Sequence, residues 1–475
     1  MNKEQLITST RNSRKPSESN IRVGKDILEL IAGGMYNQPV AMLREYIQNA
    51  VDSIDVASQK NLYEQLTPRI DIRIDKANRS LRITDNGAGI TSRSFEKVML
   101  SIGGSTKRGT KHRGFRGIGR FAALSFCKEL IFRTKAKSDK KVSEIKWSGI
   151  KFKKALSSNE DEFDLFKIVS EICEISTSEA EDERPHFFEV ELNGLVRYQN
   201  DTLLNEKDLD IYLSQVAPVP FLEDFSYAST INEYLASYEE LNKSYKIFIS
   251  ANENEKQVFK PYTDEFKFSD FTTDHFNEVE FKEFDNIDGE IAVVGWVLHS
   301  SYLGALPRKL PFKGIRMRDG NIQVGSETLL TQLFKEQRFN SWIVGEFHVL
   351  KKSLIPTARR DEFEANNHYS DFQNKFMSYA NTLEQKLRNQ SSYRANKAKL
   401  RGDIERIDSK IEILRQGSVS NSRAQILLAE VAGDLNELNQ KIDTQKLIDS
   451  DKSELNSRSD EISIEIKHYQ ENYIY

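Results

Sequence analysis

Three polar residues with helical spacing could carry out phosphoryl chemistry. Glu45, Asn49 and Asp52 stand at positions i, i+4 and i+7. At about 100° per residue, their side chains fall within roughly 60° on one helical face. A carboxylate, an amide and a second carboxylate on one face suit a site that binds a metal-bound phosphate and moves a proton. The same spacing also fits a solvent-exposed polar stripe, so the rest of the chain must decide between the two interpretations.

A second candidate site follows a predicted strand. The segment Asp85-Asn-Gly87-Ala-Gly89-Ile90 ends that strand in a glycine turn. Glycine lets a ligand approach the backbone because no Cβ stands in the way. A carboxylate at a strand end can accept a hydrogen bond from an exocyclic amine such as that of adenine. Taken alone, the segment also fits an ordinary Asn-Gly turn.

A glycine-rich stretch supplies a third candidate. Gly114-Phe-Arg-Gly117-Ile118-Gly119 precedes an apolar helical run at residues 121–126. Such a loop at a helix N-terminus binds phosphate through exposed N–H groups and the helix dipole. The preceding segment, which contains Thr106 and Lys107, is cationic and could cover a polyphosphate as a lid. A basic surface loop is the alternative, and the absence of a G-x-x-x-x-G-K-[ST] segment excludes a Walker-type site.

The elements that must position these residues are readable from periodicity. Residues 43–55 have apolar residues at helical spacing, which predicts an amphipathic helix. Residues 69–75 and 80–84 alternate apolar and polar residues, which predicts two strands. Residues 128–152 and 187–193 are expected to hold further strands.

The chain divides into four predicted parts. Residues 1–20 form a flexible arm, and residues 21–205 form the first domain with an acidic insertion at 157–185. Residues 208–370 form a second mixed α/β domain, with strand candidates at 245–250, 291–299 and 342–350. Residues 372–475 are nearly free of glycine and proline and carry heptad-like spacing in two runs, which predicts a coiled-coil helical hairpin with its turn at 417–422. The runs are Leu400, Ile404, Ile407, Ile411 and Leu414, and Leu428, Val431, Leu435, Leu438 and Ile442.

Composition excludes several classes of protein. The net charge of −4 over 475 residues gives no general attraction to nucleic acid or to an anionic membrane. Two cysteines, Cys127 and Cys173, cannot build a disulfide framework or a zinc site. No stretch approaches 18 apolar residues and no signal segment is apparent, so we expect a cytoplasmic protein without a membrane partner.

Together and in this order, the three motifs resemble the GHKL ATPase superfamily, which includes DNA gyrase, the ninety-kilodalton heat-shock chaperones, histidine kinases and MutL. The segment Leu43-Arg-Glu-Tyr-Ile-Gln-Asn-Ala-Val-Asp52 looks most like the chaperone branch. The resemblance implies a mixed α/β fold: a Bergerat-fold α/β sandwich that binds ATP, followed by an α/β middle domain.

Carried over residue by residue, the resemblance implies ATP and Mg²⁺ as ligands. Glu45 would be the general base, Asn49 the Mg²⁺ ligand, Asp52 a support of the pocket and Asp85 the reader of the adenine amine. The phosphates and the adjoining pocket would be contacted by a further set of residues: Gly87, Gly89, Ile90, Thr106, Lys107, Gly114, Gly117, Ile118 and Gly119.

The second domain also resembles the chaperones' middle segment. There an arginine after Leu354-Ile-Pro-Thr would reach the γ-phosphate; Arg360 is our choice, with Arg359 as the neighbouring alternative. One departure concerns a threonine that the family usually places near the adenine on a late strand. Here that strand begins His186-Phe-Phe-Glu-Val190, without a threonine.

These features favour an ATP-driven conformational clamp that acts on a protein client or partner, with the tail joining two chains as a homodimer. A DNA-associated clamp like MutL or MORC is an alternative, although the tail has 16 basic against 16 acidic residues over 373–475. An ATP-binding scaffold within a multi-component system, such as a defence system, is another. A histidine kinase is disfavoured because the first 20 residues contain no histidine.

Overall fold

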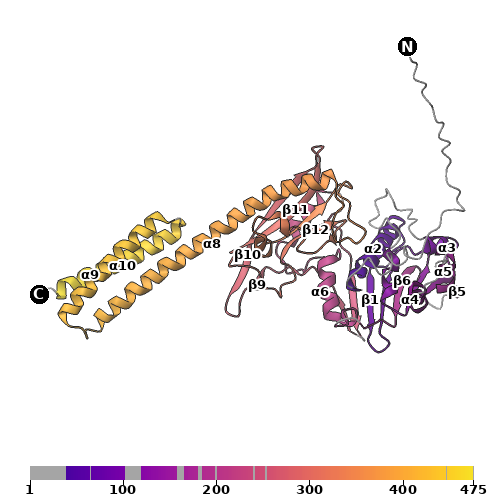
Figure 1. Cartoon of the computed structure of the whole chain (residues 1–475), viewed down its shortest axis with the longest axis horizontal. Helices are drawn as coiled ribbons and strands as arrows, with labels where there is room; N and C mark the ends of the chain where they lie inside the picture. The colour runs from indigo at the N-terminus through magenta and orange to yellow at the C-terminus, as the bar shows by residue number, and fades with distance from the viewer. Residues whose placement is uncertain are drawn as a thin grey trace, which may run out of the picture.

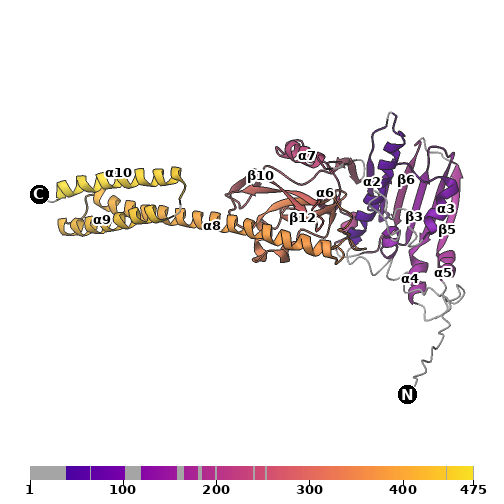
Figure 2. The same cartoon turned by 90° about the horizontal axis from the view of Figure 1, so that it is seen from above.

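The computed structural model describes residues 39–64, 66–101, 119–157, 165–179, 184–197, 200–238, 241–251, 254–445 and 447–473. Two β-sheet units lie side by side, and a long helix runs from the second unit to a helical tail (Figures 1 and 2). We name them the first unit, the second unit and the tail. The predicted arm at 1–20 lies outside the described residues.

The first unit is built on an eight-stranded sheet with the order β5-β4-β3-β6-β2-β1-β7-β8. Helices pack on one face of this sheet, with α2 next to β2, α3 next to β4 and α4 next to β3. The strands are β1 (Ile70–Asp75), β2 (Ser80–Asp85), β3 (Glu129–Lys135), β4 (Lys141–Ser148), β5 (Cys173–Glu179), β6 (Phe187–Asn193), β7 (Ile247–Ala251) and β8 (Asn254–Gln257). The helices are η2 (Pro39–Met42), α2 (Leu43–Gln59), α3 (Ser92–Leu100), η3 (Gly119–Ser125), α4 (Gly149–Ser157), α5 (Leu165–Ile172), η4 (Thr202–Leu204) and α6 (Glu206–Val216).

Alternation along the strands gives this sheet one apolar face and one charged face. On β2, Leu81 and Ile83 are buried in the core against the helices. On the opposite face, the Arg133 guanidinium lies 3.0 Å from Glu189 and 2.7 Å from Glu144 on the neighbouring strands. The helices that the structure describes, and any site between them and the sheet, therefore lie on the apolar face.

The first sheet extends past the predicted domain boundary at 205–208. β7 pairs in parallel with β1, with Ile70 opposite Ile247, and β8 closes the edge. The strand predicted near 245–250 is present, but it belongs to the first sheet and not to the second domain's own sheet. A parallel pairing between segments this far apart leaves no local signal, because it needs a long crossover connection.

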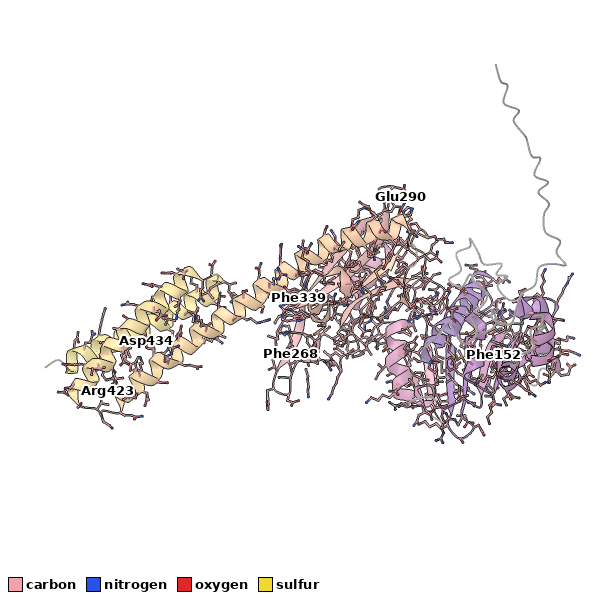
Figure 3. The ribbon with its side chains drawn as sticks, in the orientation of Figure 1. Phe152, Phe268, Glu290, Phe339, Arg423 and Asp434 are labelled. Atoms are coloured by element: carbon pink, nitrogen blue, oxygen red, sulfur yellow. The ribbon has the colours of Figure 1, made fainter. Side chains whose placement is uncertain are left out.

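The second unit is a six-stranded sheet, with the order β13-β12-β14-β11-β10-β9, covered on both faces. Val293 and Val297 of β11 face one core together with the start of α8, while Trp296 faces an aromatic core beside α7. Phe339, labelled in Figure 3, belongs to the core that this sheet shares with α8. The elements are α7 (Ala228–Ala236), β9 (Glu265–Lys267), β10 (Thr273–Asp285), β11 (Ile291–Ser300), β12 (Gly314–Asp319), β13 (Ile322–Val324), η5 (Thr331–Leu333), η6 (Gln337–Trp342) and β14 (Val344–Val349).

The tail has three helices: α8 (Asn367–Arg415), α9 (Asn421–Thr444) and α10 (Asp449–Tyr473). Asn366 caps α8 by accepting a hydrogen bond from the Tyr369 backbone N–H at 2.8 Å. Helix α9 runs antiparallel to α8, with Lys410 2.8 Å from Asp434, and α10 runs parallel to α8, with Arg415 2.7 Å from Glu465. Figure 3 places Asp434 along this bundle and Arg423 at its distal end. Among the described residues, no helix has the length and apolar character needed to cross a bilayer.

The predicted mixed α/β class and helical C-terminus are confirmed, and α10 adds a third helix to the expected hairpin. Both heptad runs are buried within one chain, together with Leu455, Ile462 and Ile466 of α10. A second copy of the chain is therefore not required to cover these apolar positions. The sequence pattern did not predict α10, because its apolar residues are sparse among serines and charged residues.

The three-helix core gives a testable expectation. Ile407 is 1% exposed and Ile464 is 68% exposed. We expect Ile407→Ala to destabilise the tail by about 2–4 kcal/mol, because it leaves a cavity. Ile464→Ala serves as the control and should change stability by less than about 0.5 kcal/mol. Urea unfolding followed by helical circular dichroism measures both; equal losses would contradict this packing.

Candidate functional site

Helix α2 brings the first three candidate residues to the inner face of the first sheet. Asp52 is buried, whereas Glu45 and Asn49 are partly exposed at the α2 surface. The apolar face of α2, including Leu43, Ile47 and Ala50, lies in the main core of the unit. The predicted helix and the shared polar face are therefore present, and the polar face is not a fully solvated stripe.

The turn after β2 packs directly against α2. The Gly87 backbone N–H donates to the Asp85 carboxylate at 2.9 Å, and the Ala88 N–H donates to the Ser53 carbonyl at 3.1 Å. A Cβ at Gly87 would lie 2.1 Å from the Ser53 hydroxyl, so only glycine fits there. Asp85 is buried, and burial together with the charges of Asp85 and Asp55 raises the pKa of nearby Tyr63.

The far end of this turn is anchored by the neighbouring strands. Gly89 has a φ of +65°, and a Cβ on it would lie 2.2 Å from the Lys135 carbonyl. The Ile90 N–H donates to the Thr134 hydroxyl at 2.9 Å, and this hydroxyl donates to the Phe187 carbonyl at 2.8 Å. The turn therefore has a fixed shape before any ligand contact is considered.

His186 holds the middle of the same turn. Its Nδ1 lies 2.7 Å from the Gly87 carbonyl oxygen, and its Nε2 lies 3.2 Å from the Leu62 carbonyl oxygen. The imidazole is buried and meets the Tyr63 ring edge-on at 5.9 Å. It thereby links the turn to the connection between α2 and β1.

The end of the glycine-rich stretch lies against Glu45. A Cβ at Gly119 would be 2.2 Å from the Glu45 Oε2 atom. The next residue, Arg120, donates to the carbonyls of Val98 and Ser101 at 2.6 and 2.5 Å, and burial lowers its pKa to about 10. Five other predicted residues of this stretch lie outside the described residues: Thr106, Lys107, Gly114, Gly117 and Ile118.

The second unit reaches into this site through Arg360. Its Nε atom lies 3.8 Å from the Glu45 carboxylate, and its Nη1 atom lies 3.5 Å from the Asp319 carboxylate at the end of β12. Arg360 is buried, whereas Arg359 is exposed. The structure therefore brings Arg360, and not its neighbour, to the predicted general base.

The backbone at Arg360 adopts a conformation that is unusual for this residue type. Its φ is +54°, in the left-handed region, which costs roughly 1–3 kcal/mol outside glycine. Its carbonyl accepts from the Gly325 N–H and from Arg44 Nη1, each at 2.7 Å. Arg44 precedes Glu45 on α2, so the same helix holds the loop and presents the carboxylate.

The late strand that lacks the family's usual threonine is β6. Phe188 is the register partner of Asp85 on β6, and Thr134 is the register partner of Phe188 on β3. The hydroxyl nearest to the turn therefore comes from one strand further away, and both of its hydrogen bonds go to the backbone. Phe188 packs against Phe132, with ring centroids 6.1 Å apart.

Sequence reasoning missed four residues of this site: Arg44, Arg120, Thr134 and His186. Arg44 was adjacent to Glu45, but nothing local showed that it would bond to a loop of the other unit. Thr134 and His186 form their bonds across strands distant in the sequence, which leaves no spacing to detect.

Part of the chain matches a known protein family. Residues 36–175 match the family described as "Histidine kinase-, DNA gyrase B-, and HSP90-like ATPase". This range contains Glu45, Asn49, Asp52, the Asp85 turn and Gly119, but not Arg360 or the tail.

Curated relatives agree with the family match. The chain is 39% identical to the chaperone protein HtpG of Fusobacterium nucleatum over 97 residues, which cover 18% of this chain and 15% of the relative. It is 31% identical to HtpG of Klebsiella pneumoniae over 144 residues (26% and 23%) and 29% identical to HtpG of Escherichia coli over 141 residues (26% and 23%). The chain thus matches less than a quarter of each relative's length. Over residues 36–175, the chain is therefore similar to the GHKL ATPase superfamily, and the relatives named here are HtpG chaperones.

Proposed function

We propose that the chain is a Mg²⁺-dependent ATPase that couples nucleotide hydrolysis to a conformational change acting on a protein client or partner. The observation that carries this proposal is the approach of Arg360, from the second unit, to Glu45, on α2 of the first unit. A carboxylate and an arginine supplied by separate units next to a glycine-lined site suit phosphoryl transfer, in which positioning and charge stabilisation dominate.

We assign each residue the role that the family resemblance implies. Glu45 would accept the proton of the attacking water, and Asp85 would accept a hydrogen bond from the adenine amine. Asp52 would support the pocket from the buried side of α2, while Gly87, Gly89 and Ile90 would shape the turn beside the adenine. Gly119 lets the backbone approach Glu45 and the phosphates. Thr106, Lys107, Gly114, Gly117 and Ile118 keep their predicted phosphate contacts as part of this proposal.

The residues present fit Mg²⁺ held mainly by its substrate. The described ranges contain no group of three His, Cys, Asp or Glu side chains that could hold a metal without further ligands. Mg²⁺ commonly binds through one or two protein oxygens together with phosphate oxygens and water. The Asn49 side-chain oxygen, one helical turn from Glu45, is the protein ligand we assign, and the ion would neutralise phosphate charge when bound.

Arg360 would stabilise negative charge on the γ-phosphate and report its presence to the second unit. Its loop leads within a few residues to α8, which continues into the tail. A phosphate that binds Arg360 would therefore act on the loop that leads to α8, the helix that runs from the second unit along the tail. Client binding and a homodimer remain parts of the proposal. Because the apolar heptad positions of the tail are buried within one chain, a dimer would form through another surface. Sedimentation equilibrium measures whether the chain dimerises.

Turnover by charge variants tests the catalytic assignment. Glu45→Gln should lower kcat by about 10²–10⁴-fold, because the general base is lost. Arg360→Ala should lower kcat by at least about tenfold, because charge stabilisation is lost. Arg359→Ala is the matched control and should leave kcat within about twofold. Steady-state ATP hydrolysis, with MgATP affinity from calorimetry, measures all three; full activity in Glu45→Gln would remove this residue from the chemistry.

The close approach of Gly119 to Glu45 gives a separate expectation. Gly119→Ala puts a methyl group where the Glu45 carboxylate now lies, so we expect kcat to fall at least about tenfold. Gly433→Ala is the control, since its Cβ would meet nothing within 4 Å on the tail helix α9. Hydrolysis rates for the two variants decide it: equal rates would show that the two residues are not packed as described.

A further inference from the structure

Three segments carry the chain between the two units, and each contributes to both cores. Residues 217–221 place Val219 in the first unit's core and Phe221 in the second unit's aromatic core. Residues 241–245 do the same with Leu241 and Tyr245, and residues 258–262 with Val258 and Tyr262.

Backbone hydrogen bonds tie these segments to one another. The Tyr245 N–H donates to the Pro218 carbonyl, and the Lys260 N–H donates to the Pro220 carbonyl, each at 2.8 Å. The junction is therefore built like an interior element and not like a free linker.

A buried ionic cluster lies on the second sheet beside this junction. The Glu346 carboxylate accepts from Arg318, from Lys260 at 2.7 Å and from the Tyr262 hydroxyl at 2.7 Å. All four side chains are nearly inaccessible to solvent. Although burial opposes ionisation, the charges of Arg318 and Lys260 hold the pKa of Glu346 well below its usual range.

Arg318 of this cluster and the nearby Arg316 also form hydrogen bonds to the first unit. Arg318 donates to the Gln215 carbonyl at 2.7 Å, and Arg316 donates to the Gln215 side-chain oxygen at 3.1 Å. Gln215 lies in the last turn of α6, where unpaired carbonyls and the helix dipole favour a positive charge. The other face of α6 is held in the first core by Leu209 and Leu213. Both units therefore hold the same helix.

Burying charges is costly, and apolar residues of similar volume often stabilise a protein as well or better. Overall stability thus does not explain the cluster, whereas a fixed orientation between the units does. We propose that Arg318, held by Glu346, is a positioning residue: it fixes the second unit on the first, so that Arg360 already lies beside Glu45 before nucleotide binds. This inference rests on the proposed function for its kinetic consequence, but the rigid junction itself can be tested without ATP.

The test measures the distance between the units in the full chain. Spin labels go on Gln59→Cys at the exposed end of α2 and Ile287→Cys in the exposed β10–β11 turn, with Cys173 changed to serine and Cys127 left buried. Pulsed electron resonance should give one narrow distance in the nucleotide-free chain. Arg318→Met should broaden that distance and lower kcat at least about tenfold. Its MgATP affinity should stay within about threefold, because the proposed adenine pocket belongs to the first unit.

The controls keep the outcomes separate. Arg338→Met removes an exposed arginine of the second unit and should change neither distance nor rate. Lys260→Met, which frees a crossing segment but leaves the Arg318–Glu346 pair, is used if Arg318→Met does not fold. A wild-type distance that is broad until the ATP analogue is added, or variants that keep the narrow distance and full kcat, would overturn the inference. If ATP does not bind at all, the proposed function fails, and the nucleotide-free distances still decide the junction.

Discussion

The second unit meets the candidate site through the electrostatic contact between the Arg360 guanidinium and the Glu45 carboxylate. Its two partners lie on different units, so their meeting requires both units to be correctly oriented. Neither side chain is fully exposed, and the surrounding backbone is specialised on both sides: Gly119 leaves room beside the carboxylate, and Arg360 adopts a positive φ. Structural strain of this kind is retained where neighbouring contacts over-determine it, which is a frequent property of functional sites.

Several elements converge to maintain this contact. Arg44 holds the Arg360 carbonyl from α2, and the hairpin of β12 and β13 brings Asp319 and Gly325 to the same loop. Behind it, the buried cluster around Glu346 fixes the hairpin's sheet against α6. The loop then continues through Phe363, whose ring lies 5.3 Å from that of Tyr369 at the start of α8. A change at the site therefore has a packed route to the tail.

Local pattern predicted much of this structure, because periodicity and turn chemistry are local properties. The helix with Glu45, the strand that ends at Asp85 and the glycines around it were found in this way, and the family resemblance was confirmed. Pairing between distant segments was not predictable: β7 joined the first sheet, α10 joined the tail, and Thr134 and His186 met the turn at Gly87 and Ile90. The approach of Arg360 to Glu45 was expected only from resemblance, since no property of residues 354–361 alone shows which arginine turns inward.

Direct binding of MgATP is the measurement to make first, because every proposed role requires a nucleotide between α2 and the turn after β2. Calorimetric titration of the full chain should show one ATP bound per chain. Asp85→Asn should weaken binding at least about tenfold, since an amide in place of the carboxylate can present its NH₂ group to the adenine amine. Absence of binding by the wild type, or an equal affinity in the wild type and Asp85→Asn, would contradict the assignment of this site to adenine nucleotides.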